Sequence, residues 1–113
     1  MVSSKEYLGK DVEVLVDRKL GTRNHNYNFI YPLNYGYIAN TISGDGNELD
    51  AYVLGEYVPL EEVKGMCIAL IHRKDDCDDK LVVTTDGRSY TDDQIKALTQ
   101  FQERFHDIEI WRL

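Results

Sequence analysis

The sequence predicts one mainly β domain of the α+β class, with short strands along most of the chain and one late helix. Short runs of alternating or β-branched apolar residues recur along the 113 residues, and turn-forming residues separate them. A helical pattern is found only after residue 90. No repeat, low-complexity stretch or linker divides the chain, so residues 1–113 are predicted to form a single domain. This pattern is typical of a small barrel with a covering helix, although by itself it does not distinguish a barrel from an open sheet.

Five segments have the composition of strands. In the first, Val12, Val14 and Val16 alternate with other side chains. The second is rich in aromatic residues, and Pro32 places it near an edge or a bend. Gly55 ends the third, the fourth is continuously apolar, and the fifth contains a β-branched run. The five segments are residues 12–16, 29–38, 49–54, 66–72 and 80–84.

The helix is predicted to begin after Thr91. Gln94, three residues later, completes a capping box with Thr91, and the intervening aspartates suit the positive end of the helix dipole. Four residues at helical spacing are expected to pack on the sheet: Gln94, Leu98, Phe101 and Phe105. Residues 108–113 are predicted to form a last short strand.

Composition excludes several classes of function. A net charge of −7 and a pI near 4.8 argue against binding to nucleic acid, which requires a basic surface. The longest apolar run, residues 66–71, is far too short to span a membrane, and the first ten residues lack the apolar core of a signal peptide. Two cysteines are too few for a disulfide framework. We therefore expect a cytoplasmic protein without membrane or nucleic-acid partners.

The most informative stretch is residues 31–50, YPLNYGYIANTISGDGNELD. Its tyrosine hydroxyls can donate to phosphate oxygens, and its oxygen-bearing side chains Asp45, Asn47 and Asp50 are of the type that holds hard divalent cations. Taken alone, the segment that carries Asp45, Asn47 and Asp50 also fits a turn with solvated acidic side chains. Beside the tyrosines, it predicts a Mg²⁺ site with a phosphate held above it. An acidic protein that handles phosphate needs such a cation to invert the local charge.

This stretch resembles the signature of the soluble (family I) inorganic pyrophosphatases, in which Tyr-Pro-x-Asn-Tyr-Gly-Tyr/Phe is followed by Asp-Gly-Asp-Pro-x-Asp. The resemblance implies a five-stranded OB-like β-barrel with one C-terminal covering helix. It also implies Mg²⁺-dependent hydrolysis of inorganic pyrophosphate to two phosphates by metal-activated water. Signature residues apart, the chain looks like a short, divergent member, because the family's hairpin before the Tyr-Pro motif is cut to residues 26–30.

The resemblance assigns Asp45 and Asp50 as metal ligands and places Asn47 where the family has an aspartate that helps to activate water. An amide can coordinate a cation but cannot accept a proton as a carboxylate does. Glu48 is adjacent and is the candidate to replace it, unless the segment is extended and directs Glu48 the other way. The family also keeps a glutamate on its first strand, for which Leu15 is the nearest match here.

A second acidic cluster, residues 75–79, precedes Lys80. In the family the matching loop supplies two metal-binding aspartates, the second of them two residues before a phosphate-binding lysine. That pattern assigns Asp78 and Lys80, and either Asp75 or Asp76 as the first aspartate, with Asp75 the better match. Without the resemblance, the cluster also fits an exposed acidic hairpin.

Phosphate contacts are assigned in the same way. Tyr35 and Tyr31 match family tyrosines, although both also fit as barrel aromatics with satisfied hydroxyls. Arg23 lies eight residues before Tyr31, where the family keeps a substrate arginine, and an alternative alignment gives the substrate-clamp place to His25. The C-terminal Tyr-Lys pair of the family is replaced by Phe105, better explained as core, and by His106. His106 can meet a phosphate when protonated, although a helix-end histidine favoured by the dipole accounts for it better.

Three functions are consistent with these assignments. The first is inorganic diphosphatase activity. The second is hydrolysis of an organic phosphoanhydride such as a nucleotide, because the lost hairpin and Tyr-Lys pair open one wall of the site. The third is a catalytically weak relic of the family that binds metal or phosphate. Self-association into a homo-oligomer is left open.

Overall fold

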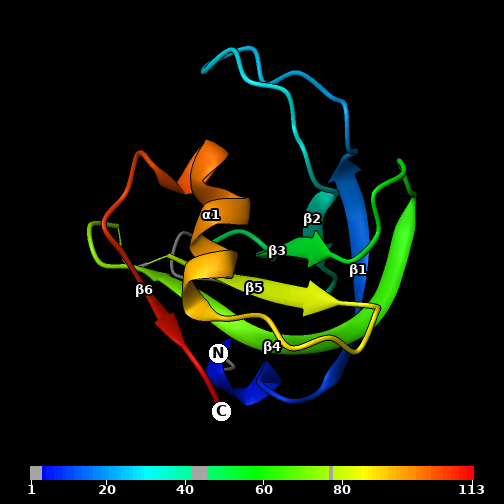
Figure 1. The fold of residues 1–113 in the computed structure, drawn as a ribbon, viewed down its shortest axis with the longest axis vertical. Helices are drawn as coiled ribbons and strands as arrows, with labels where there is room; N and C mark the ends of the chain where they lie inside the picture. The colour runs from blue at the N-terminus through cyan, green and yellow to red at the C-terminus, as the bar shows by residue number, and fades with distance from the viewer. Residues whose placement is uncertain (1–3, 42–45, 77) are drawn as a thin grey trace.

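The computed structural model describes residues 4–41, 46–76 and 78–113 and consists of six strands, one α-helix and one 3₁₀ helix (Figure 1). In chain order these are η1 (Ser4–Tyr7), β1 (Asp11–Arg18), β2 (Tyr35–Ile38), β3 (Leu49–Leu54), β4 (Glu62–Arg73), β5 (Asp79–Thr84), α1 (Asp92–Glu103) and β6 (Ile108–Trp111). Neither helix is long and apolar enough to cross a membrane, within the residues described.

Five of the strands close into a barrel. Their order is β1-β2-β3-β5-β4, and β1 pairs again with β4, so the sheet returns to its first strand. All barrel pairings are antiparallel except that between β3 and β5. The short β6 extends the sheet by pairing with the far end of β4. The predicted five-stranded barrel with one covering helix is confirmed, as is the last short strand.

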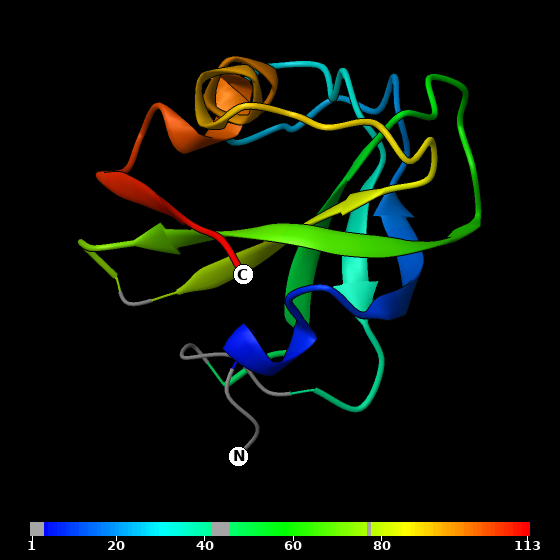
Figure 2. The same ribbon diagram turned by 60° about the horizontal axis from the view of Figure 1, so that its bottom comes forward.

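Two apolar cores lie on opposite faces of the same strands. Along β3, Ala51 and Val53 belong to one core, while Tyr52 and Leu54 belong to the other. The first core draws side chains from all five barrel strands and therefore fills the barrel. The second contains Ile95 of α1 and lies between the barrel wall and the helix, which Figure 2 shows nearly end-on above the strands. The outer face of the barrel beneath α1 is thus the place where polar side chains of β2, β3 and β5 can be shielded from water.

The start of α1 follows the sequence, and its inner face follows it in part. Thr91 accepts a hydrogen bond from the backbone N–H of Gln94, and the Gln94 side chain accepts one from the backbone N–H of Thr91, which confirms the capping box. This use keeps Gln94 exposed. Leu98 and Phe101 pack against the second core as predicted, and the most buried positions of the helix are Ile95, Thr99 and Glu103. The prediction that Phe105 is a core residue is wrong: the helix ends at Glu103, and Phe105 is 44% exposed.

The second strand is shorter than predicted. Residues 29–34 do not join β2, which begins only at Tyr35. Pro32 lacks a backbone donor for a sheet ladder, and the side chain of Asn34 instead accepts from the N–H of Leu20 and donates to the carbonyl of Val58. Residues before β2 therefore form an irregular segment beside the end of α1 rather than a strand.

Gly36 is required where β1 and β2 pair. A Cβ atom on residue 36 would lie 2.0 Å from the carbonyl oxygen of Leu15, which is backbone and cannot rotate away. We expect Gly36→Ala to lower the free energy of unfolding by about 3 kcal/mol or more, measured by urea denaturation. Gly87→Ala is the control, because residue 87 has open space around it and pays only the cost of its positive φ, about 1–2 kcal/mol. Equal losses in the two variants would contradict this account.

Candidate functional site

A polar cavity of about 510 Å³ lies at one end of α1, against the outer face of the barrel. Strand residues form its floor, the segment that precedes β2 forms one wall, and the end of α1 with the turn after it forms another. It is lined by Asp17, Arg18, Asn24, Tyr27, Tyr31, Tyr35, Asp50, Arg73, Asp76, Asp78, Lys80, Gln102, Phe105 and His106.

The sheet register brings the central group of this cavity together. Asp50 on β3 is directly opposite Lys80 on β5, and alternation along the strands directs both side chains away from the barrel interior. Asp50 Oδ2 accepts hydrogen bonds from Lys80 Nζ at 2.9 Å and from the Tyr35 hydroxyl at 2.8 Å. Lys80 Nζ also donates to Asp78 Oδ2 at 2.5 Å. Four residues that the sequence singled out separately therefore form one hydrogen-bonded group.

Burial and charge fix the protonation of two members of this group. Burial, reinforced by the negative charge of Asp50, raises the pKa of Tyr35 well above its usual value, so the hydroxyl remains a donor. Burial alone would lower the pKa of Lys80, but the carboxylates of Asp50 and Asp78 outweigh it and the pKa is raised. The site therefore holds a neutral phenol and a positive ammonium side by side at neutral pH.

A buried ion pair between β4 and α1 fixes one of the residues that line the cavity. Arg73, at the end of β4, donates from Nε and Nη2 to the two carboxylate oxygens of Glu103 on α1, at 2.8 and 2.7 Å. The Tyr52 hydroxyl donates to the same carboxylate at 2.5 Å. The remaining nitrogen, Arg73 Nη1, lies 3.5 Å from Asp76 Oδ2 and 3.9 Å from Asp78 Oδ2. Glu103 thus aims one nitrogen of Arg73 toward the acidic side of the cavity.

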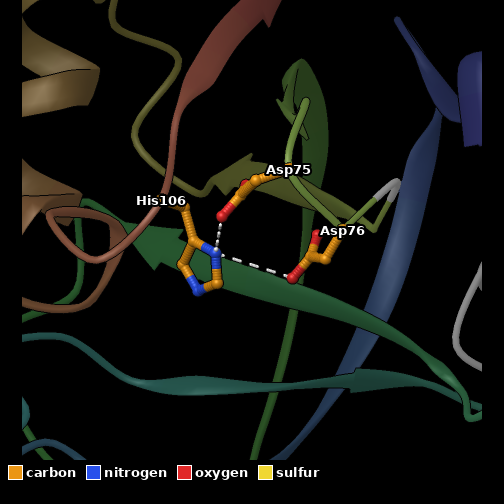
Figure 3. A group of neighbouring side chains, drawn as sticks. All are labelled: Asp75, Asp76 and His106. Atoms are coloured by element: carbon orange, nitrogen blue, oxygen red, sulfur yellow. Dashed lines mark hydrogen bonds and ion pairs between the residues drawn. The ribbon is translucent and has the colours of Figure 1, made fainter.

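A second acidic group lies at the rim, where the loop between β4 and β5 meets the turn after α1 (Figure 3). His106 Nδ1 is 3.0 Å from Asp75 Oδ2 and 3.6 Å from Asp76 Oδ2. Partial desolvation of Asp75 is outweighed by its hydrogen bond with His106, which holds the pKa of that carboxyl below its usual value. Ligand atoms of the three side chains lie within 4.8 Å of one another, which is close enough to hold a metal ion. Asp76 and His106 also line the cavity, whereas Asp75 does not.

Several of the residues predicted for the site lie elsewhere. Arg23 and His25 line a neighbouring cavity of about 450 Å³, and the Arg23 guanidinium donates to the Asn28 side chain. Asn47 and Glu48 are exposed in the turn before β3, outside the cavity lining. Asp45 lies outside the described residues. Tyr31 is in the cavity wall, but its hydroxyl donates to Gln102 Oε1 at 3.2 Å.

Other residues of the cavity were missed by sequence reasoning. Asp17 and Arg18 follow the alternating run of β1 directly, so their position at a strand end was the available signal. Burial raises the pKa of Asp17, and Asp50 adds to that increase. Asp17 thus supplies an acidic group near the end of the first strand. The resemblance implied a glutamate on this strand, for which Leu15 was the nearest match. Glu103 does not line the cavity but holds Arg73, which does; its signal was its spacing of four residues from Thr99 along α1.

The donor set fits a divalent cation. Asp50, Asp76, Asp78 and Asp17 all bring carboxylates to the cavity, and hard cations prefer such oxygen ligands. Asp78 Oδ1 is buried and has no hydrogen-bond partner among the described residues, an arrangement that a protein normally avoids unless something else satisfies the atom. With cationic Lys80, Arg73 and Arg18 beside these carboxylates, the cavity can hold a metal ion and a phosphate-bearing anion together.

Comparison with protein families and curated sequences gives one consistent result. The inorganic pyrophosphatase family profile matches residues 6–112. The inorganic pyrophosphatase of Saccharolobus solfataricus is 30% identical over 87% of this chain, and that of Pseudomonas aeruginosa is 32% identical over 93%. The aligned regions cover 55% and 67% of those two relatives, so the chain spans about half to two thirds of their length.

Solved structures agree on the fold. The inorganic pyrophosphatase of Ehrlichia chaffeensis superposes with a TM-score of 0.69 over 93% of this chain and 86% of its own, at 17% sequence identity. The enzyme of Thermus thermophilus gives a TM-score of 0.60 over 90% of this chain and 82% of its own, at 16% identity. At these identities the likeness shows a shared barrel and helix.

Proposed function

This chain belongs to the inorganic pyrophosphatase family, and on that premise we propose that it hydrolyses inorganic pyrophosphate to two phosphates with Mg²⁺ as cofactor. The observation that carries the proposal is the hydrogen-bonded group of Tyr35, Asp50, Asp78 and Lys80 at the base of a polar cavity. Carboxylates, an ammonium and a neutral hydroxyl lie together in this group, which supports its use by a metal ion and by phosphate oxygens.

Asp50 and Asp78 are the proposed metal ligands, with Asp76 favoured over Asp75 as the third because Asp76 lines the cavity. The buried, unpartnered oxygen of Asp78 supports this choice. When bound, Mg²⁺ supplies a more acidic water and neutralises charge on the phosphates. Asp45 stays a prediction for the same role.

The phosphates are proposed to contact Lys80, Arg73 and Tyr35. Lys80 supplies a positive charge that its carboxylate neighbours hold in place, and Arg73 offers the Nη1 atom that Glu103 leaves toward the cavity. The single hydroxyl proton of Tyr35, which Asp50 accepts in this structure, becomes available to a phosphate when that oxygen of Asp50 binds a metal. These fixed donors stabilise the charge that develops on the leaving phosphate. We therefore propose Arg73 for the clamp role, for which Arg23 and His25 stay predictions, and His106 for a contact at the rim.

The proton of the attacking water is proposed to go to Asp17. A general base works best when its pKa lies nearer the working pH, and the pKa of Asp17 is raised by burial and by Asp50. Asn47 cannot accept a proton, and Glu48 is exposed outside the cavity.

The test is phosphate release from pyrophosphate by the purified protein, with Mg²⁺ and after removal of divalent cations with a chelator. We expect turnover with Mg²⁺ and a loss of at least about 100-fold without it, because uncompensated carboxylates repel the anion. Full activity after chelation would overturn the metal role. No turnover under either condition would overturn the proposed hydrolysis of pyrophosphate.

Restoring the family pattern before β3 is a second test of the site. We expect Asn47→Asp combined with Glu48→Pro to raise kcat by about tenfold, which corresponds to ~1.4 kcal/mol, if the added carboxylate reaches the metal. The measurement is steady-state kinetics with pyrophosphate at saturating Mg²⁺. Glu48→Pro alone is the control for effects of the turn. An unchanged kcat in the double variant would show that a carboxylate at residue 47 does not limit turnover.

A further inference from the structure

The mouth of the cavity has an aromatic side that a small inorganic anion does not use. Tyr27 is 57% exposed and Phe105 is 44% exposed, and both line the same cavity as Asp50 and Lys80. Their ring centroids are 4.6 Å apart with an interplanar angle of 32°. Segments far apart in the chain, the loop before β2 and the turn after α1, supply the two rings.

We propose that Tyr27, backed by Phe105, is a stacking platform for the base of a nucleoside diphosphate or triphosphate whose phosphates occupy the polar end of the cavity. This inference rests on the proposed hydrolase function and names a substrate class for the same site. The Tyr27 ring offers the stacking face, because contact between the two rings leaves no space for a base between them. Base–aromatic stacking is tolerant of base identity, so the platform would favour any nucleoside with a planar base rather than one particular nucleobase.

Size and charge both point to a ligand larger than pyrophosphate. Cavities of roughly 300–1,000 Å³ accommodate drug-sized ligands, and this one measures about 510 Å³. Lys80, Arg73 and Arg18 lie with the carboxylates in the lining, so a metal-bound polyphosphate meets positive charge there. The rings stand at the exposed rim, where an attached nucleoside would emerge. A polar anion end and an apolar planar end within one cavity match the two ends of a nucleotide.

The reaction remains the same hydrolysis. The oxygen of water bonds to the terminal phosphorus of ADP, the bridging P–O bond breaks, and its electron pair stays on the departing AMP. The proton of the water passes to the proposed base Asp17, and the products are AMP and phosphate. No oxidant, reductant or further reactant is needed.

The experiment compares binding of two non-hydrolysable ligands by calorimetry in the presence of Mg²⁺: methylenediphosphonate, which has no base, and α,β-methylene-ADP, which has one. Wild type is expected to bind the adenosine compound about tenfold more tightly. Tyr27→Ala is expected to abolish that preference, Phe105→Ala to reduce it, and Tyr27→Phe to retain it. Tyr57→Ala is the matched control, because Tyr57 is 55% exposed but does not line the cavity.

The outcomes separate this inference from the function on which it rests. Turnover of pyrophosphate with no preference for the adenosine compound in wild type would overturn the platform and leave the hydrolase. Binding of neither compound, with no turnover, would overturn the hydrolase itself. A wild-type dimer in sedimentation that Tyr27→Ala dissociates would assign the rings to contact between two copies of the chain, and would also overturn the platform.

Discussion

Replacing Asp50 with asparagine is expected to reduce kcat/KM for pyrophosphate by at least about 100-fold, because loss of even an outer-shell partner of a metal costs about 10–100-fold. Asp50 is central to the site: its Oδ2 atom accepts from both Lys80 and Tyr35. Asparagine has nearly the same shape but no charge, so it binds a divalent cation less well and no longer balances the Lys80 ammonium. Kinetics at several Mg²⁺ concentrations should show that the loss is only partly recovered at high Mg²⁺.

The matched control is Asp79→Asn, which removes the same charge from the residue next to Lys80. Asp79 pairs with His72 at 2.7 Å and does not line the cavity, and its side chain lies on the opposite face of β5 from Lys80. A similar loss of activity in both variants would show that general electrostatics, rather than a metal ligand at residue 50, controls turnover. Thermal unfolding of both variants should confirm that they are folded.

Those parts of the fold that follow from local pattern were predicted well from the sequence. β3 has the predicted bounds, and the capping box at Thr91 is in place. The extent of the second strand was predicted less well. The aromatic run around Pro32 has the composition of a strand, but hydrogen bonds of the Asn34 side chain to the backbone hold it as an irregular segment. Closure of the barrel depends on the long-range pairing of β1 with β4, which periodicity cannot reveal and which only the resemblance supplied.

The same limit applies to the site. Tyr35 and Asp50 were predicted from the signature, and Asp78 and Lys80 from the acidic loop before β5; the sheet register brings these four side chains together. Arg73 and Glu103 were missed, because a charged residue at the end of an apolar strand and one on a helix become a pair only through tertiary packing. The cytoplasmic location and self-association stay predictions.

Replacing one partner of the Arg73–Glu103 pair by an apolar residue is expected to have the largest effect on stability. Glu103 is 2% exposed and Arg73 is 8% exposed, so Glu103→Leu leaves a buried guanidinium without its bidentate partner and a buried Tyr52 hydroxyl without its acceptor. Such a loss costs about 3–5 kcal/mol. The melting temperature should fall by on the order of 10–20 °C for a domain of this size. A fall of less than about 4 °C would mean that water or the nearby aspartates already compensate Arg73.

The double variant Arg73→Met with Glu103→Leu separates the two roles of the pair. Replacing both charges by apolar side chains of similar volume removes the unpaired charge, so most of the lost stability should return. Activity should not return with it, because the proposed phosphate contact of Arg73 Nη1 is absent from the folded double variant. If the double variant regained both stability and turnover, the pair would only join α1 to β4. If it regained stability alone, the buried ion pair would contribute little net stability and would serve to hold a cation at the edge of the carboxylate cluster.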